Sequence, residues 1–212
     1  MSDIFAAKAA KWDANPVRAA MGQAFYAQVL ENAPKFLGCD LAGRTVLEFG
    51  CGTGVLGLHL AQDHAARLHF VDTSPAMLDV LRGKLAQAEL PQAQVHQGNL
   101  HELSIPLASV DLAVSLMALH HVEDVPGALA GLRRLLRPGG LLLLGDLLPE
   151  DGGFHGDEAA AHNGFDPEKL RDQCQSQGYQ VQRLLPFHLL RKPDATGALR
   201  EYPLFFLAAS AR

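Results

Sequence analysis

Three glycines follow directly on a short apolar stretch of the chain, at Gly50, Gly52 and Gly54. Glycine lets the backbone approach a ligand closely, and a helix that begins after such a turn presents free N–H groups to that ligand. The next apolar stretch ends in Asp72, whose carboxylate can accept hydrogen bonds from both hydroxyls of a ribose. These residues predict a crevice that binds a nucleoside, against the alternative of a tight strand-to-helix turn without a ligand.

The glycines alone do not decide which nucleoside cofactor binds, because the pattern Gly52-x-Gly54-x-x-Gly57 also matches the dinucleotide fingerprint. Glu48, in the strand just before Gly50, favours a different cofactor. Its carboxylate would repel a pyrophosphate and attract a ligand whose end near the loop is cationic, and S-adenosylmethionine has such an end. A NAD-dependent Rossmann oxidoreductase is the alternative, although the sequence lacks a Tyr-x-x-x-Lys pattern.

The elements that must position these residues are strands that alternate with helices from residue 45 onward, which is typical of an α/β fold with a mostly parallel sheet. The expected strands are residues 45–49, 67–72, 94–97, 110–116 and 141–147. The expected helices are residues 16–36, 54–64 and 126–136, one that begins at Pro75 after the cap Ser74, and one from Pro167 to Gln177. Residues 179–190 and 201–209 predict a terminal antiparallel hairpin, with a turn that contains Pro193, Asp194 and Gly197.

Composition narrows the class of protein. The 212 residues show no shift in composition, so we expect a single domain. The chain has 18 Lys and Arg against 23 Asp and Glu, a net charge of −5 and no basic run, which argues against a nucleic-acid partner. Neither a membrane span nor a signal peptide is apparent in the sequence. Three widely spaced cysteines predict no disulfide framework, so a cytoplasmic location is expected, while oligomeric state is not indicated.

Five motifs, in order along the chain, resemble those of the class I S-adenosylmethionine-dependent methyltransferases. They are Glu48-Phe49-Gly50-Cys51-Gly52-Thr53-Gly54, Val71-Asp72-Thr73-Ser74-Pro75-Ala76-Met77-Leu78, Gly98-Asn99-Leu100, Asp111-Leu112-Ala113-Val114-Ser115 and Leu136-Arg137-Pro138-Gly139-Gly140. In detail the chain is similar to the small-molecule enzymes of the ubiquinone-biosynthesis-like branch, in which His-His-Val or Glu-His-Val follows the fourth strand.

This resemblance implies both a fold and an activity. The fold is a Rossmann-like, doubly wound sheet of seven strands in the order 3-2-1-4-5-7-6, with strand 7 antiparallel and helices on both faces. The activity is transfer of a methyl group from S-adenosylmethionine to O, S, N or C of a small-molecule substrate, releasing S-adenosylhomocysteine. A catalytically silent module that only binds the cofactor is the alternative.

The resemblance also implies which residues contact the cofactor. The three glycines would line its methionine part, Asp72 would hold the ribose, and Met77 would pack near the adenine. Asn99 stands where the family usually has an aspartate, and its carbonyl can still accept a hydrogen bond from the adenine amino group, without the charge. The full implied set is Glu48, Gly50, Cys51, Gly52, Thr53, Gly54, Asp72, Thr73, Ser74, Met77, Asn99, Leu100 and Ser115.

The methyl acceptor should lie beside the cofactor, where ligands bind at the carboxyl ends of the strands of a doubly wound sheet. His120 and His121 follow the fourth predicted strand at this point, and His120 occupies the position of a functional glutamate in related enzymes. Because an imidazole exchanges protons near neutral pH, we expect His120 as the first candidate for a general base and His121 as the second. The alternative is that these histidines cap the strand end.

Two segments are expected to shape the acceptor site, residues 1–40 as an N-terminal helical cap and residues 148–165 as a lid or, alternatively, a solvated loop. The expected substrate contacts are Trp12, Met117, Phe154, His155 and His162. The histidines, with Asp157 and Glu158, could instead hold a metal ion. No tight ligand spacing in the sequence supports a metal site, and we expect none.

Overall fold

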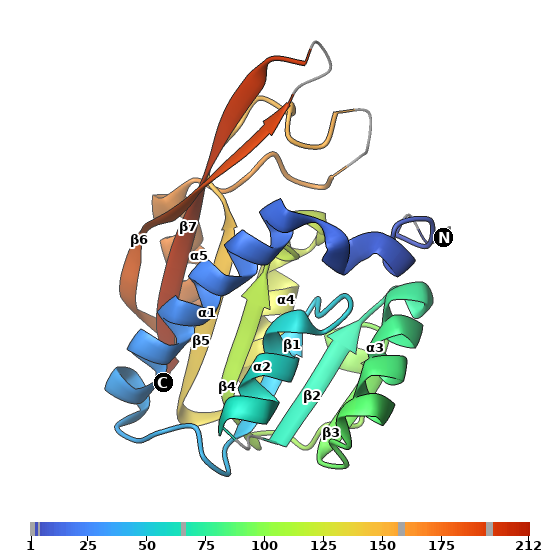
Figure 1. The fold of residues 1–212 in the computed structure, drawn as a ribbon. Coiled ribbons are helices and arrows are strands. Elements are labelled where there is room, and N and C mark those ends of the chain that lie inside the picture. The colour runs from blue at the N-terminus through green and yellow to red at the C-terminus, as the bar shows by residue number, and fades with distance from the viewer. Residues whose placement is uncertain (1–2, 4, 65–66, 157–159, 194–196) are drawn as a thin grey trace.

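The structure is a computed structural model, and it describes residue 3 and residues 5–64, 67–156, 160–193 and 197–212. Its centre is a seven-stranded sheet in the order β3-β2-β1-β4-β5-β7-β6 (Figure 1). The strands are β1 (Thr45–Phe49), β2 (Arg67–Asp72), β3 (Ala93–Gln97), β4 (Val110–Leu116), β5 (Leu136–Leu147), β6 (Tyr179–Pro193) and β7 (Leu199–Ala211). The first five strands pair in parallel, and β7 runs antiparallel to both neighbours. The predicted strand order is confirmed.

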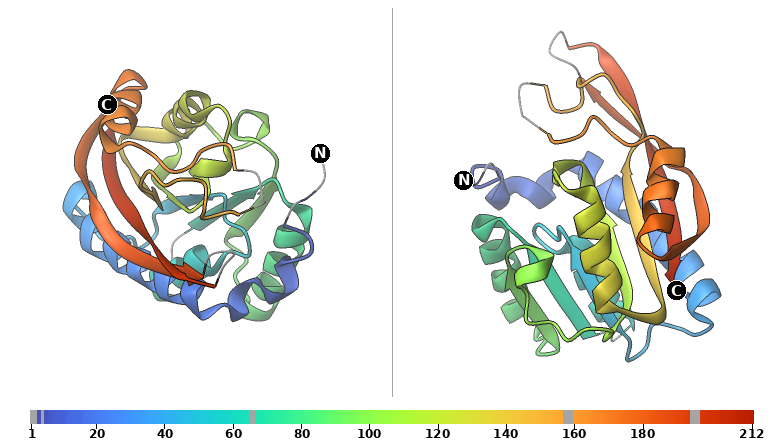
Figure 2. Two further views of the ribbon diagram at one scale, coloured as in Figure 1. Left: turned by 90° about the horizontal axis from the view of Figure 1, so that it is seen from above. Right: turned by 180° about the vertical axis from the view of Figure 1, so that it is seen from behind.

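Helices cover both faces of this sheet (Figure 2). On one face, Phe25, Leu60 and Leu78 belong to one buried apolar cluster, and on the other Leu129 and Leu170 belong to a second. The first cluster lies under α1 (Pro16–Leu37), α2 (Val55–His64) and α3 (Pro75–Ala88), and the second lies under α4 (Val125–Leu135) and α5 (Pro167–Ser176). Three short 3-10 helices complete the elements: η1 (Ala9–Ala14), η2 (Leu100–Glu102) and η3 (Leu119–His121).

The helix starts agree with the capping residues of the sequence. The Ser74 hydroxyl accepts a hydrogen bond from the Met77 backbone N–H at 3.2 Å, and Pro75 occupies the first turn of α3, where its missing N–H has no cost. Asn15 caps α1 in the same way, by accepting from the Val17 N–H at 2.9 Å. These caps fix α3 directly after the end of β2, beside the predicted crevice.

Strand β5 begins five residues earlier than expected, at Leu136 instead of Leu141. Leu136 already pairs with Val110 of β4, and the register then shifts so that Leu141 pairs with Leu112. The proline and glycines between them were predicted to form a turn, and the structure accommodates them as an irregularity within the strand, with Gly139 at a φ of 74°.

The β6–β7 hairpin is longer than predicted and projects past the carboxyl ends of the parallel strands (Figure 1). Asp194, part of the predicted turn, lies outside the described residues. In both views of Figure 2 the loop that follows β5 runs beside this projecting hairpin. The loop and the hairpin therefore stand at the edge of the sheet where the sequence places its ligands.

Candidate active site

The three predicted glycines form a tight loop, residues 50–54, between β1 and α2. Gly50, Gly52 and Gly54 have φ values of 66°, 51° and 73°, in the left-handed region that favours glycine. A Cβ atom on Gly50 would lie 2.2 Å from the Ala118 Cβ, so this position also lacks room for a side chain. The Cys51 N–H donates to the Val71 carbonyl at 3.0 Å, which ties the loop to the end of β2.

Asp72 lies directly beside this glycine loop. One carboxylate oxygen accepts from the Gly52 N–H at 2.7 Å, and the other accepts from the Ser74 N–H at 2.9 Å. Partial burial raises the pKa of the Asp72 carboxyl, while these backbone hydrogen bonds act in the opposite direction. The carboxylate is therefore held at the point where the glycine loop meets the start of α3, as a ribose-binding acid requires.

Glu48 is buried in β1, with 5% of its surface exposed, and accepts a hydrogen bond from the Gly57 N–H at 3.0 Å. Burial raises the pKa of the Glu48 carboxyl to about 8; the negative charge of Asp72 adds to this shift, and the Gly57 hydrogen bond opposes it. A cation bound nearby would favour the ionised carboxylate. The site thus contains two acids whose electrostatics suit a positively charged ligand.

The N-terminal segment crosses over these residues (Figure 1). The Asp3 carboxylate accepts from the Ser74 hydroxyl at 2.8 Å, and the Thr53 hydroxyl donates to the Asp13 carboxylate at 2.6 Å. The indole nitrogen of Trp12 would lie 3.9 Å from a Cβ atom on Gly52, which places this ring at the glycine loop. Asp3, Trp12 and Asp13 therefore lie against the glycine loop and the start of α3, and Asp3 and Asp13 are residues of the candidate site that sequence reasoning missed.

The end of β4 brings a buried histidine to the same edge of the sheet. Met117, the first residue after the strand, has a φ of 54°, an uncommon conformation for a non-glycine residue that concentrates at functional sites. His120, in η3, is 1% exposed, and its Nδ1 lies 2.6 Å from a carboxylate oxygen of Asp146. Because a carboxylate oxygen only accepts, Nδ1 carries the proton and Nε2 carries the lone pair.

Asp146 is a third residue of the candidate site that sequence reasoning missed. It is 1% exposed near the end of β5, and it also accepts hydrogen bonds from the backbone N–H groups of His120 and Leu147. An acid inside the apolar run 141–147 was the available signal, since a charged residue is rarely buried without a partner.

The other predicted acceptor-site residues separate into two groups. His121, His155 and Phe154 lie around His120, with ring centroids 4.2, 4.9 and 6.3 Å from the His120 ring. His162 is not part of this group: its ring Nε2 donates to the Val122 carbonyl at 2.9 Å. His162 thus anchors the loop after β5, and Asp157 and Glu158 of the same loop lie outside the described residues.

The remaining predicted cofactor residues differ in exposure. Met77, Cys51, Leu100, Thr53 and Ser115 are buried, whereas Thr73 and Asn99 are exposed. Burial raises the pKa of the Cys51 thiol well above its usual value, so a role through small size is favoured over a reactive thiolate.

A family model for a methyltransferase domain matches residues 46–140 of this chain. The matched segment runs from β1 through the glycine loop, Asp72 and His120 to the start of β5. This part of the chain is similar to a methyltransferase domain, as the sequence motifs imply. The cofactor of this family is S-adenosylmethionine.

Individual proteins similar to this chain agree with the domain match. The chain is 31% identical over 145 residues to an uncharacterised methyltransferase of Schizosaccharomyces pombe, covering 61% of this chain and 51% of the relative. It is 31% identical over 108 residues to a ubiquinone biosynthesis O-methyltransferase of Xanthomonas oryzae pv. oryzae, covering 51% and 45%. The chain thus spans about half the length of these curated relatives. A crystal structure of a SAM-dependent methyltransferase from Aquifex aeolicus shares the fold, with a TM-score of 0.72 at 18% identity and coverage of 97% and 98%.

The crevice fits S-adenosylmethionine, the cofactor of the matched family, in three respects. Gly50 leaves a cradle that a Cβ atom would close, Glu48 supplies a buried acid for a cationic end, and the Ser115 hydroxyl is buried without a hydrogen-bond partner among the described residues. A buried hydroxyl of this kind is rarely left without a partner in a folded protein, and a polar ligand would supply one.

Among the described residues, no helix combines the length and apolar composition needed to cross a membrane.

Proposed function

We propose that this methyltransferase transfers the methyl group of S-adenosylmethionine to a small-molecule acceptor and releases S-adenosylhomocysteine. The observation that carries the proposal is the meeting of the glycine loop and the Asp146–His120 pair at one edge of the sheet: Gly50 lies against Ala118, two residues before His120. When bound, the cofactor supplies a methyl group activated on a positively charged sulfur. The matched relatives that modify small molecules, such as the ubiquinone biosynthesis enzyme, support an acceptor of this class.

The protein's own part in binding the cofactor follows from the geometry. The backbone of the glycine loop and the Glu48 carboxylate would hold the cationic methionine end, and Asp72 would hold the ribose hydroxyls. Met77 is buried at the start of α3 and would pack against the adenine. Asn99 is exposed after β3, where its side-chain N–H donates to Glu102 at 3.4 Å and its carbonyl would accept from the adenine amino group. The residues proposed to bind the cofactor all lie at or near the carboxyl edge of the sheet.

His120 would act on the acceptor through Nε2. Asp146 fixes the ring and the tautomer, so the lone pair of Nε2 accepts the proton of an acceptor hydroxyl or thiol as the new bond to the methyl carbon forms. Trp12, Met117, Phe154 and His155 would form the walls around that acceptor. His121 contacts the Phe5 ring edge-on, with centroids 5.3 Å apart, which links the histidines to the N-terminal segment.

The proposal also covers the location, the partners and the domain organisation of the protein. We place the protein in the cytoplasm, which the three free cysteines support, and propose neither a nucleic-acid nor a membrane partner, which the net charge of −5 supports. We propose a single methyltransferase domain in which residues 1–40 cap the cofactor and residues 148–165 cover the acceptor.

Calorimetry tests cofactor binding. We expect S-adenosylhomocysteine to bind and NAD not to bind; tight NAD binding would instead support the oxidoreductase. Asp72→Asn should weaken S-adenosylhomocysteine binding by about 10- to 100-fold, because hydrogen bonds to a charged acceptor contribute about 1.5–3 kcal/mol. The matched control is Asp79→Asn, since the Asp79 side chain is 74% exposed on α3, the helix that follows β2. Equal affinity in the two variants would contradict the ribose assignment.

Removal of the His120 imidazole tests its role in transfer. With methyl-labelled S-adenosylmethionine and a metabolite extract as the acceptor source, we expect His120→Ala to lower the rate of label transfer by on the order of 100-fold or more. The affinity for S-adenosylhomocysteine should not change, because His120 lies on the acceptor side. His101→Ala removes a histidine whose side chain is 72% exposed and should transfer at the wild-type rate. If the wild type consumes no cofactor with any extract, the silent cofactor-binding module is supported instead.

A further inference from the structure

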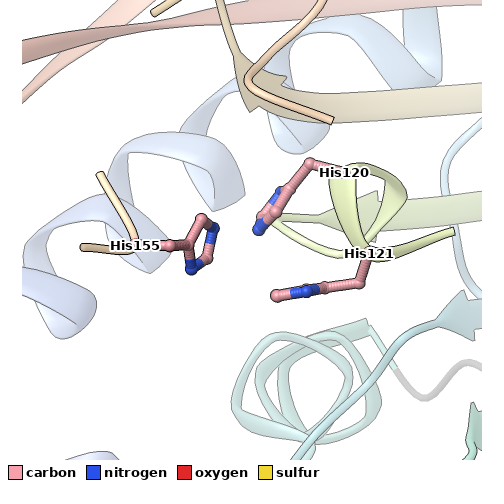
Figure 3. Close-up of side chains that lie close together, drawn as sticks. All are labelled: His120, His121 and His155. Carbon is pink, nitrogen blue, oxygen red and sulfur yellow. The ribbon is translucent and has the colours of Figure 1, made fainter. Parts of the chain in front are cut away.

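Three histidine side chains from two separate parts of the chain face one another at the acceptor side of the crevice (Figure 3). His120 and His121 belong to η3, and His155 belongs to the loop after β5. One ring nitrogen from each residue can be chosen so that all three lie within 4.8 Å of one another. The sequence predicted all three residues for the acceptor site, but it offered no tight ligand spacing for a metal ion, because His155 is far from the other two along the chain.

The buried member of the group, His120, has one ring nitrogen without a hydrogen-bond partner among the described residues. This nitrogen, Nε2, is shielded from solvent. A buried polar atom left in this state costs about 1–3 kcal/mol, so a ligand at this position is expected. Figure 3 shows the His120 ring directed into the space between His121 and His155. The unpartnered lone pair is therefore available to a ligand that His121 and His155 can also reach.

We propose that His120, His121 and His155 form a site for one divalent transition-metal cation, with Zn²⁺ as the best-matched ion. Imidazole nitrogen is a preferred ligand of Zn²⁺ and of its neighbours in the first transition row, whereas Mg²⁺ and Ca²⁺ prefer oxygen. Asp146 supplies the second feature of such sites, a carboxylate behind a ligating histidine that fixes its tautomer and orientation.

The geometry requires a modest adjustment on binding. In a tetrahedral zinc site the ligand nitrogens lie roughly 3.3–3.4 Å apart, as the usual Zn–N distance of about 2.0–2.1 Å dictates. From separations of up to 4.8 Å, the ring nitrogens of His121 and His155 would move toward that of His120 by on the order of 1.5 Å. Such a movement is within the reach of side-chain rotation for the half-buried His121 and His155, while Asp146 holds His120 in place.

Three protein ligands leave one coordination position open, as in catalytic zinc sites. The part of the inference that follows rests on the proposed function. An acceptor hydroxyl or thiol in the open position would have its pKa lowered by the cation, and its proton would pass to water. His120 would then hold the cation instead of the proton, and the acceptor would be held beside the methyl group.

Metal titration of the full chain tests the site without any cofactor. Protein stripped with a chelator should bind one equivalent of Zn²⁺ by calorimetry, and Co²⁺ in its place should give the visible absorption typical of a four-coordinate site. His155→Ala should weaken Zn²⁺ binding by at least about 100-fold, and Asp146→Asn by about 10- to 100-fold. His101→Ala is the matched control and should bind like the wild type. S-adenosylhomocysteine binding should stay at the wild-type level in His155→Ala, which shows that this variant is folded.

Two results would overturn the proposal. One is Zn²⁺ binding by the wild type that is no tighter than that of His155→Ala, and the other is a Co²⁺ spectrum typical of six coordination by water. Failure of the proposed function is separate, since it appears as loss of S-adenosylhomocysteine binding by the wild type. The rate of label transfer tests whether the ion binds the methyl acceptor. This rate should fall in the stripped wild type and return when Zn²⁺ is added. An equal rate with and without the metal would contradict this role of the ion and would leave His120 as the proton acceptor.

Discussion

Gly50→Ala is expected to destabilise this protein by about 2–4 kcal/mol and to weaken S-adenosylhomocysteine binding by on the order of 100-fold or more. Two separate effects add. Alanine at a φ of 66° is strained, and its Cβ atom would lie 2.2 Å from that of Ala118, so the backbone must move. The movement displaces the loop that would hold the methionine end of the cofactor. Chemical denaturation measures the first effect and calorimetry at a temperature where the variant is folded measures the second.

Gly83→Ala is the matched control for this prediction. Gly83 lies inside α3, its φ is not positive, and a Cβ atom there would meet nothing within 4 Å. Because glycine weakens a helix interior, this substitution should stabilise the protein by about 0.5–1 kcal/mol and leave cofactor affinity unchanged. A Gly50→Ala variant that binds as tightly as Gly83→Ala would show that the glycine loop does not contact the cofactor.

The second large effect concerns pH and Glu48. The folded-state pKa of this carboxyl, about 8, lies above the usual glutamate value of 4.5, so the folded protein binds the proton more tightly than the unfolded chain does. The free energy of unfolding therefore decreases as pH rises from about 4.5 to about 8, by on the order of a few kcal/mol in the absence of ligand. Glu48→Gln should abolish this decrease and should be more stable than the wild type at pH 9. Denaturant titrations across this pH range measure the difference.

Ligand binding should respond to pH with the opposite sign. Ionised Glu48 would attract the α-ammonium group, which S-adenosylhomocysteine shares with the cofactor, so wild-type affinity for S-adenosylhomocysteine should increase as pH rises toward about 8, by up to tenfold for each pH unit. Glu48→Gln should bind weakly and with little dependence on pH over this range. Glu123→Gln, which alters an exposed glutamate, should follow the wild type. A wild-type affinity that decreases over this range would contradict a cationic ligand at Glu48.

Much of the fold could be predicted because local signals agreed with the tertiary structure. β1, β2 and β4 have the predicted bounds, and the Ser74-Pro75 pair marks the start of α3. The glycine loop could be predicted because its three glycines lie close together in the sequence. Asp72 could be predicted because it stands at the end of a strand. The predicted start of β5 was wrong. A Pro-Gly-Gly run is a local signal for a turn, and the pairing of Leu136 with Val110 overrides it.

The parts of the site that sequence reasoning did not find depend on contacts between distant segments. Asp146, which sequence reasoning missed, meets the predicted His120 because β4 and β5 are neighbours in the sheet. Asp3 and Asp13 meet Ser74 and Thr53 because the N-terminal segment crosses the carboxyl edge. Each pairing is fixed by strand order and loop path, which composition and periodicity do not contain.

The contacts of Asp3 bear on where a tag or reporter can be fused to the protein. Asp3 sits at the first turn of α3 beside the crevice, whereas the Arg212 N–H donates to the Gly178 carbonyl just before β6, at the opposite edge of the sheet (Figure 1). A purification tag or fluorescent reporter fused ahead of Asp3 emerges at the cofactor crevice, and one fused after Arg212 emerges away from it. The first attachment point therefore suits a sensor of cofactor occupancy, and the second suits measurements that must leave the crevice undisturbed.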